Sequence, residues 1–253
     1  MRFLKIQDPT GLPVGLEAAT TQRRRLLGQP LLRRIAYVRR NRCSVLLAGL
    51  FVFILVHPLL ADSAIGGTFL AFGTLTILLL GLWALHARRR MLLLVGILAL
   101  LTFHGIAADR LGEHWLRPAT LLVTATFMGT ITAALLYYVL DWHPITIDKV
   151  FGAVAAYVLI AFTFACLFGL LQQIQSGAFH AAPMYVPNDQ LDWSAMMYFS
   201  FTVLTSTGFG EITPVTRMAR ALIVVEQVMG VMYVAFLVAR LANLYGTRGH
   251  RSS

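Results

Sequence analysis

The chain carries the stretch Thr205-Ser206-Thr207-Gly208-Phe209-Gly210 between two long apolar blocks. Two glycines separated by a single residue permit positive φ angles that other residue types adopt only at a cost in energy. A backbone of that kind can point successive carbonyl oxygens in one direction. A row of carbonyls around an axis can replace the water shell of a cation without a net charge that would trap it. The stretch is therefore a candidate ion-binding site.

A short apolar run leads into this stretch and is typical of a helix. It extends from Trp193 to Thr205, and a helix of that length measures about 20 Å, too short to cross a bilayer. Asp192 directly precedes it and can cap the exposed N–H groups of the helix start. We expect the chain to enter the membrane as this helix and to return as an extended strand. Irregular backbone is tolerated at membrane depth only where protein buries it or water lines it, which predicts a pore or a cavity.

Apolar blocks of membrane-spanning length make up most of the remaining chain. Of its 253 residues 58% are hydrophobic and 13% are charged, whereas soluble domains average about 25% charged residues. Each block approaches the ~20 residues that a helix needs to cross the hydrocarbon core. We therefore predict an all-α membrane protein with six transmembrane helices and a re-entrant pore helix with its loop between the fifth and sixth. The six blocks are Cys43–Leu60, Thr68–His86, Met91–Ala108, Thr120–Leu140, Val150–Leu171 and Met218–Tyr245.

The basic residues are distributed unevenly between the two sides of this topology. With the N-terminus inside, 17 of the 21 Lys and Arg residues lie in cytoplasmic segments, and the other side holds Arg110, Arg117, Arg217 and Arg220. Cytoplasmic loops of membrane proteins carry such an excess. We therefore expect a multi-pass protein of the plasma membrane, in a bacterium the inner membrane, with both termini and a short tail at 246–253 in the cytoplasm. The net charge of +10 reflects these flanking residues and predicts no nucleic-acid partner.

Residues 1–42 form a polar and basic segment before the first apolar block. Its end alternates apolar and basic pairs, as in Leu31-Leu32-Arg33-Arg34. That spacing allows a helix that lies on an anionic lipid surface. The same composition also suits a disordered basic tail, and both interpretations stay open.

The run Ser206-Thr207-Gly208-Phe209-Gly210, with Glu211 after it and Pro214-Val215-Thr216 beyond, resembles the filter of the tetrameric potassium-channel superfamily. That family reads Thr-Val-Gly-Tyr-Gly-Asp at these positions. The resemblance covers about residues 150–245 and is to the six-transmembrane type with one pore loop. It implies a pore domain at 142–245, a four-helix bundle at 43–141 and a homotetramer. It also implies K⁺ coordination by Ser206, Thr207, Gly208 and Phe209, with no cofactor besides the permeant ion.

Three residues depart from the family pattern. Ser206 stands where the family usually has Thr, and it keeps the hydroxyl but loses the methyl group that fixes the side-chain rotamer. Thr207 replaces an aliphatic residue and needs a hydrogen-bond partner if it is buried. Phe209 replaces Tyr and lacks its hydroxyl group. Potassium selectivity is the expected function, and a non-selective cation channel is the first alternative.

The last apolar block supplies the expected pore-lining helix. Gly230 lies twenty residues after Gly210, where the resemblance places a hinge. Close packing against a neighbouring helix is an equally good reason for glycine there. We expect one face of this helix to line the pore. Its apolar side chains could instead pack against lipid or the protein core. This face carries Val231, Val234, Ala235 and Val238.

Glu226 is an acidic side chain well inside this last block. Carboxyl groups at membrane depth are costly and are usually paired or functional. We expect Glu226 to support the filter from behind, protonated or hydrogen-bonded to Thr202, Thr207 or Gln227, with Thr202 and Glu211 as further supporting residues. The alternative is a carboxylate that extends into a water-filled crevice.

Other functions fit the sequence less well. Thr120–Leu140 contains no Lys or Arg, whereas voltage sensing needs several charges, each contributing about 2.3 kcal/mol per 100 mV. We therefore expect no conventional voltage gating. A second alternative is a potassium transporter subunit or a sensor with a channel-like fold. No catalytic triad, metal-ligand cluster or phosphate loop is evident in the sequence, so we do not expect an enzyme.

Overall fold

The computed structural model describes residues 42–61, 66–85, 96–98, 100–105, 114–141, 146–182 and 191–249. The predicted basic segment lies outside these residues except for Arg42, and so does the end of the tail at 250–253. Contact between the N-terminal segment and anionic lipid therefore stays a prediction.

The first half of the described chain is helical. It contains α2 (Arg42–Ala61), α3 (Gly66–Leu85), the short 3-10 helix η1 (His114–Leu116) and α5 (Arg117–Leu140). Residues 96–98 and 100–105 are also helical. Pro118 lies in the first turn of α5, where its missing N–H leaves no hydrogen bond of the helix unmade. α5 thus begins three residues before the predicted fourth block.

The second half contains three helices and two short strands. In chain order they are α6 (Ile147–Ile174), β1 (Phe179–Ala181), α7 (Trp193–Leu204), β2 (Ile212–Pro214) and α8 (Arg217–Gly249). Thr146 caps α6, because its hydroxyl oxygen accepts a hydrogen bond from the backbone N–H of Lys149 at 3.3 Å. α8 continues to Gly249, four residues beyond the predicted end of the last span.

Among the residues that the structure describes, four helical segments are long and apolar enough to cross a membrane: Arg42–Leu60, Arg117–Leu140, Ile147–Ile174 and Arg217–Arg240. Two shorter apolar runs, Phe72–Gly81 and Gly96–Gly105, fall within the predicted second and third spans. The fold is thus a mostly helical one with several membrane-length helices. The count of six crossings and the re-entrant placement of α7 stay predictions.

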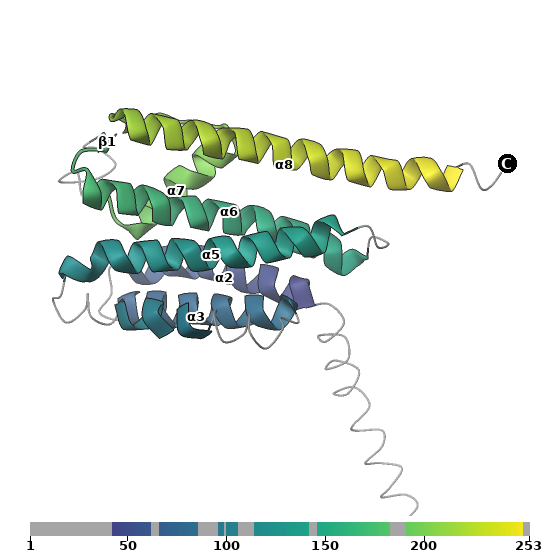
Figure 1. Cartoon of the computed structure of the whole chain (residues 1–253), viewed down its shortest axis with the longest axis horizontal. Coiled ribbons are helices and arrows are strands. Elements are labelled where there is room, and N and C mark those ends of the chain that lie inside the picture. The colour runs from purple at the N-terminus through teal and green to yellow at the C-terminus, as the bar shows by residue number, and fades with distance from the viewer. Residues whose placement is uncertain are drawn as a thin grey trace, which may run out of the picture. The chain divides into compact units, whose positions relative to one another are not determined.

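The long helix α6 takes part in two buried clusters. One cluster joins it to α2, α3 and α5 through side chains such as Leu50, Phe127 and Phe162. The other joins it to α7, α8 and the strands, with Phe168, Phe179 and Phe199 at its centre. Figure 1 shows α5 and α6 side by side, with the short α7 beside α6 and α8. Through these two clusters α6 connects the first helices to the part of the chain that carries the candidate site.

Candidate functional site

The backbone of the glycine stretch alternates in the way that a row of carbonyls requires. φ is positive at Ser206 (56°), Gly208 (56°) and Gly210 (89°), and these are alternate residues. Alternation between left-handed and right-handed backbone turns successive carbonyls toward one side. Positive φ was expected at the two glycines. Ser206 adds a third position, and it is a non-glycine residue in a conformation that costs energy. In the single chain all six residues from Thr205 to Gly210 are exposed.

The stretch begins by folding back onto the end of α7. The carbonyl oxygen of Thr202 accepts hydrogen bonds from the backbone N–H groups of Thr207 (2.8 Å) and Gly208 (3.2 Å). The backbone N–H of Ser206 donates to the carbonyl oxygen of Val203 at 2.9 Å. Thr202 therefore holds the loop through its main chain, while its own hydroxyl donates to the carbonyl oxygen of Phe199.

The hydroxyl of Thr207 lies 2.8 Å from that of Thr205. The polar group that departs from the family pattern is thus paired with a neighbour two residues before it. Because both side chains belong to an exposed part of the single chain, the bond restrains the loop without burying a polar group.

The end of the stretch at Phe209 and Gly210 is held by a residue that sequence reasoning missed. The ring of Tyr198 in α7 stacks on the ring of Phe209, with centroids 6.4 Å apart and 4° between the planes. Its hydroxyl donates a 2.7 Å hydrogen bond to Oε2 of Glu211. Phe209 thus packs against α7. Phe209 lacks a hydroxyl, and the hydroxyl of Tyr198, the sixth residue of the apolar run that begins at Trp193, bonds to Glu211 instead.

A two-stranded antiparallel sheet fixes the chain beyond the stretch. β1 pairs with β2, with Phe179 opposite Pro214 and Ala181 opposite Ile212. The backbone N–H of Ala182 also donates to the carbonyl oxygen of Glu211 at 2.9 Å. Sequence reasoning missed this pairing, because each strand has three residues and shows no alternating pattern. It connects the end of the candidate site to the segment that follows α6.

Glu226 is fully buried, but its partner differs from those expected. Its Oε1 lies 2.5 Å from Oγ of Ser200 in α7, and Ser200 Oγ lies 2.7 Å from the carbonyl oxygen of Ala161 in α6. The bonds of Thr202 and Thr207 run elsewhere, as described above, so the expectation of those two as partners is wrong. Ser200 faces away from the loop, toward α6 and α8. The spacing of residues along α7 does not predict which of them face α8, so the sequence did not identify Ser200 as the partner.

The number of protons available in the contact between Ser200 and Glu226 determines the protonation state of Glu226. A serine hydroxyl has one proton and the carbonyl oxygen of Ala161 can only accept, so Ser200 donates to Ala161. The short contact to Glu226 then needs a proton on the carboxyl group. Oε2 of Glu226 has no hydrogen-bond partner within the described part of the chain, which also favours the neutral form, since an unpaired buried charge is costly. A neutral Glu226 thus connects α8 through α7 to α6.

Gly230 lies one turn further along α8, against the end of α7. A Cβ atom at this position would lie 2.1 Å from the carbonyl oxygen of Leu204, far inside van der Waals contact. The same carbonyl accepts a 3.3 Å hydrogen bond from the hydroxyl of Tyr157 in α6. Close packing therefore accounts for the glycine. α8 runs as one helix from Arg217 to Gly249, and hinge bending at Gly230 stays a prediction.

The predicted pore-lining residues lie on a different face of α8. Val231, Val234, Ala235 and Val238 are all exposed in the single chain. The face that carries Glu226 and Gly230 packs on α6 and α7 instead, and there the hydroxyl of Tyr233 donates to the carbonyl oxygen of Ala153 at 2.6 Å. The exposed face is available for a pore, although the lining role itself stays a prediction.

The far part of α8 contacts the end of α5. The guanidinium group of Arg240 donates hydrogen bonds to the carbonyl oxygens of Val139 and Asp141. Those carbonyls belong to the last turn of α5 and the residue that follows it, where a helix leaves carbonyls unpaired. α8 is thereby tied both to α7 and to the end of α5.

Comparison with known proteins gives the same picture for this half of the chain. Residues 153–246 match the ion-channel family. Protein LctB of Bacillus caldotenax is 27% identical over 120 residues, which cover 47% of this chain and 89% of that protein. Protein LctB of Geobacillus stearothermophilus is 28% identical over 120 residues, with the same coverage. No solved structure matches. With the loop geometry above, this match supports the ion-channel superfamily for residues 153–246.

Proposed function

We propose that the chain is a subunit of a potassium-selective channel that conducts K⁺ passively. The observation that carries the proposal is the alternation of φ at Ser206, Gly208 and Gly210 between a short helix and a membrane-length helix. Carbonyl oxygens arranged by such a backbone suit a dehydrated monovalent cation. Ser206, Thr207, Gly208 and Phe209 are the proposed ligands, and the permeant ion is the only small species that the site requires.

The proposed assembly is a homotetramer. One chain supplies one carbonyl row, and a ring around an axis needs several copies related by rotation. Only 17% of the apolar, membrane-length segment of α8 is buried within the single chain, whereas 61% of the corresponding segment of α6 is buried. Large apolar side chains remain exposed on α8, and they include Val224, Val228, Met232 and Phe236. Neighbouring subunits, lipid and the pore together would cover this surface.

We further propose that the bundle before the pore domain is not a conventional voltage sensor. Within α5 the sole Lys or Arg is Arg117, at its first residue. A charge at the helix end moves little in the membrane field, and each fully moved charge contributes about 2.3 kcal/mol per 100 mV. Multi-pass insertion with both termini in the cytoplasm, in a bacterial inner membrane, completes the proposal.

The departures at Ser206, Thr207 and Phe209 make a non-selective cation channel the specific alternative. Reversal potentials of the purified protein in planar bilayers separate the two. With K⁺ on one side and Na⁺ on the other, a selective pore reverses near the K⁺ equilibrium potential, and block by barium is expected. A reversal potential near zero with an intact cation current would establish the non-selective channel instead. A chain that carries no current would favour a transporter subunit or a sensor.

A further inference from the structure

The carbonyl groups at the end of α7 accept hydrogen bonds from the loop that follows. A helix leaves its last carbonyls without partners inside the helix. The carbonyl oxygen of Thr202 accepts from the N–H groups of Thr207 and Gly208. The carbonyl oxygen of Phe201 accepts from the N–H of Thr205 at 3.1 Å. The first residues of the glycine stretch are therefore anchored to α7 through their main chain.

Two threonine hydroxyls make a second connection between this loop and α7. Oγ1 of Thr205 donates a 2.7 Å hydrogen bond to the carbonyl oxygen of Phe201, and it lies 2.8 Å from Oγ1 of Thr207. A hydroxyl group has one proton, and Thr205 uses its proton at Phe201, because a carbonyl oxygen can only accept. Thr207 is therefore the donor to Thr205. The two bonds form a hydroxyl relay that runs from Thr207 through Thr205 to Phe201.

This hydroxyl relay holds a residue whose carbonyl group is a proposed ion ligand. Thr207 lies between Ser206 and Gly208, and φ is 56° at each of these neighbours. The peptide group that carries the Thr207 carbonyl ends in the N–H of Gly208, which shares its acceptor with the N–H of Thr207. Gly208 has no Cβ atom to oppose rotation of that peptide group. The bond from the Thr207 hydroxyl therefore adds a restraint that the main chain supplies only in part.

The hydroxyl of Thr207 is placed to position the loop and not to bind the ion itself. It donates to Thr205, and the side chain of Thr205 bonds to α7, so the relay lies on the side of the loop that faces the helix. An aliphatic side chain at position 207, as in the filters that this stretch resembles, could not make this bond. Resistance of a carbonyl ring to contraction around a smaller ion is one source of selectivity.

We propose that the hydroxyls of Thr207 and Thr205 are positioning groups, which hold the carbonyl of Thr207 in place and thereby raise the discrimination between K⁺ and Na⁺. This inference rests on the proposed channel function. It gives the two side chains a role in selectivity that is separate from ion ligation by main-chain carbonyls. The polar residue that departs from the family pattern at position 207 then supports selectivity through a hydrogen bond.

Permeability ratios measured in planar bilayers test this role. Thr207→Val keeps the size and branching of the side chain and removes the donor. Because the variant loses one hydrogen bond, we expect the permeability ratio of K⁺ to Na⁺ to fall about fivefold. Thr207→Ser keeps the hydroxyl and should retain the ratio of the unsubstituted chain. An unchanged ratio in Thr207→Val, or an equal fall in Thr207→Ser, would overturn the proposal.

Thr205→Val interrupts the relay at its middle and should lower the ratio by a similar factor. The double variant Thr205→Val/Thr207→Val should then show no further fall, because two changes that break one connection are not additive. Additive falls would mean that each hydroxyl acts independently and would overturn the relay. A fall in Thr207→Val without one in Thr205→Val would identify the Thr207 hydroxyl as a direct ion ligand, which also contradicts the proposal.

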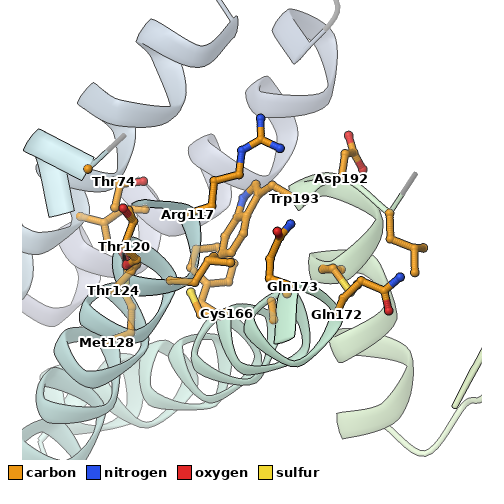
Figure 2. Close-up of a pocket in the computed structure, with 18 of the residues that line it drawn as sticks. Thr74, Arg117, Thr120, Thr124, Met128, Cys166, Gln172, Gln173, Asp192 and Trp193 are labelled. Carbon is orange, nitrogen blue, oxygen red and sulfur yellow. Dashed lines mark hydrogen bonds between the residues drawn. The ribbon is translucent and has the colours of Figure 1, made fainter. Parts of the chain in front are cut away.

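Thr120→Val is the matched control. Its hydroxyl donates to the carbonyl oxygen of Leu116 in the same run of helix at 3.0 Å. Figure 2 shows Thr120 at a cavity between α5, α6 and the start of α7, and none of the residues 205–210 lines that cavity. The permeability ratio of this variant should therefore equal that of the unsubstituted chain. An equal fall in Thr120→Val would show a general effect of losing a hydroxyl and would overturn the role of the relay.

The same recordings separate failure of this inference from failure of the proposed function. A non-selective current in the unsubstituted chain would overturn potassium selectivity, and the positioning role with it. A selective unsubstituted chain with an unchanged ratio in Thr207→Val would overturn the positioning role alone. If Thr207→Val does not assemble, Thr205→Val decides the question, with Thr205→Ser as the variant that keeps the hydroxyl and should retain the ratio.

Discussion

The polar side chains of the two halves of the chain are satisfied in different ways. In α3 and α5, threonine hydroxyls donate to the carbonyl four residues earlier in their own helix; they are those of Thr76, Thr120, Thr124, Thr126, Thr130 and Thr132. The pore domain has local bonds of this kind as well, such as that of Thr163. It adds bonds between helices, as in Tyr157 to Leu204 and Tyr233 to Ala153. Local bonds place no restraint on a neighbouring helix, whereas bonds between helices fix the position of the proposed filter.

The largest expected effect comes from replacing a glycine by alanine in each half and comparing the loss of stability and ion flux. Gly230→Ala places a Cβ 2.1 Å from the carbonyl oxygen of Leu204, and overpacking of this kind costs about 3 kcal/mol. We expect a marked fall in the thermal stability of the assembled protein and loss of ion flux. Gly129→Ala in α5 meets only an ordinary contact, 3.7 Å from Thr163, and should be neutral or slightly stabilising. Equal effects of the two changes would remove the distinction.

Removal of the hydroxyl that joins three helices should have the next largest effect. Ser200→Ala leaves the carbonyl of Ala161 and the carboxyl of Glu226 without their shared partner. Two buried groups that lose a hydrogen bond correspond to about 2 kcal/mol of lost stability. Chemical unfolding in detergent would measure it. A fall below about 0.5 kcal/mol would show that the contact is not formed.

The protonation of Glu226 can be tested separately from its packing. Glu226→Gln keeps a donor for Ser200 and should preserve folding, whereas Glu226→Leu should not. We also expect the conductance of the Gln variant to be insensitive to high pH, where the carboxyl group of the unsubstituted chain would ionise and lose its donor role. Currents measured across a pH series provide the comparison. Identical conductance, selectivity and pH dependence in the Gln variant would exclude a functional role for the carboxyl group.

The contrast between the halves also explains what the sequence predicts well. Asp192 accepts a 2.8 Å hydrogen bond from the N–H of Ala195, which confirms the predicted helix cap. The short helix and the positive φ of Gly208 and Gly210 are likewise confirmed. These features depend on local chemistry, namely a capping side chain and the missing Cβ of glycine.

The features that the sequence did not reveal depend on distant parts of the chain. The pairing of β1 with β2 joins residues more than thirty positions apart, and neither strand is long enough to show a pattern. The link from Glu226 to Ser200 depends on how α7 rotates against α8. Positive φ at Ser206 is imposed by the bonds around it, because serine itself disfavours that conformation.

A smaller effect is expected at the outer end of the filter. Tyr198→Phe keeps the ring that stacks on Phe209 but removes the hydroxyl that donates to Glu211. Because both partners are partly exposed, we expect a loss of about 0.5–1 kcal/mol and a less selective or less stable conducting state. Reversal potentials and the decay of current over time would show it. Unchanged values of both would exclude a supporting role for Tyr198.

The smallest effect should come from the first half. Thr126→Val removes an exposed hydroxyl that donates only to the carbonyl of Leu122 in the same helix. We expect a change in stability within about 0.5 kcal/mol and unchanged ion flux. A large loss would mean that Thr126 itself makes a polar contact to another helix or subunit in the assembly, which would weaken the contrast between the halves.

The measurement closest to the central claim is ion flux into liposomes that contain the purified protein. With K⁺ inside and an impermeant cation outside, the chain should allow rapid K⁺ efflux, with much slower flux when Na⁺ replaces K⁺. Gly208→Asp introduces a residue type that tolerates the positive φ of this position. The variant adds a carboxylate beside the carbonyl row and should therefore abolish the flux. No flux of either ion, with no difference between the chain and the Gly208→Asp variant, would contradict the proposed pore.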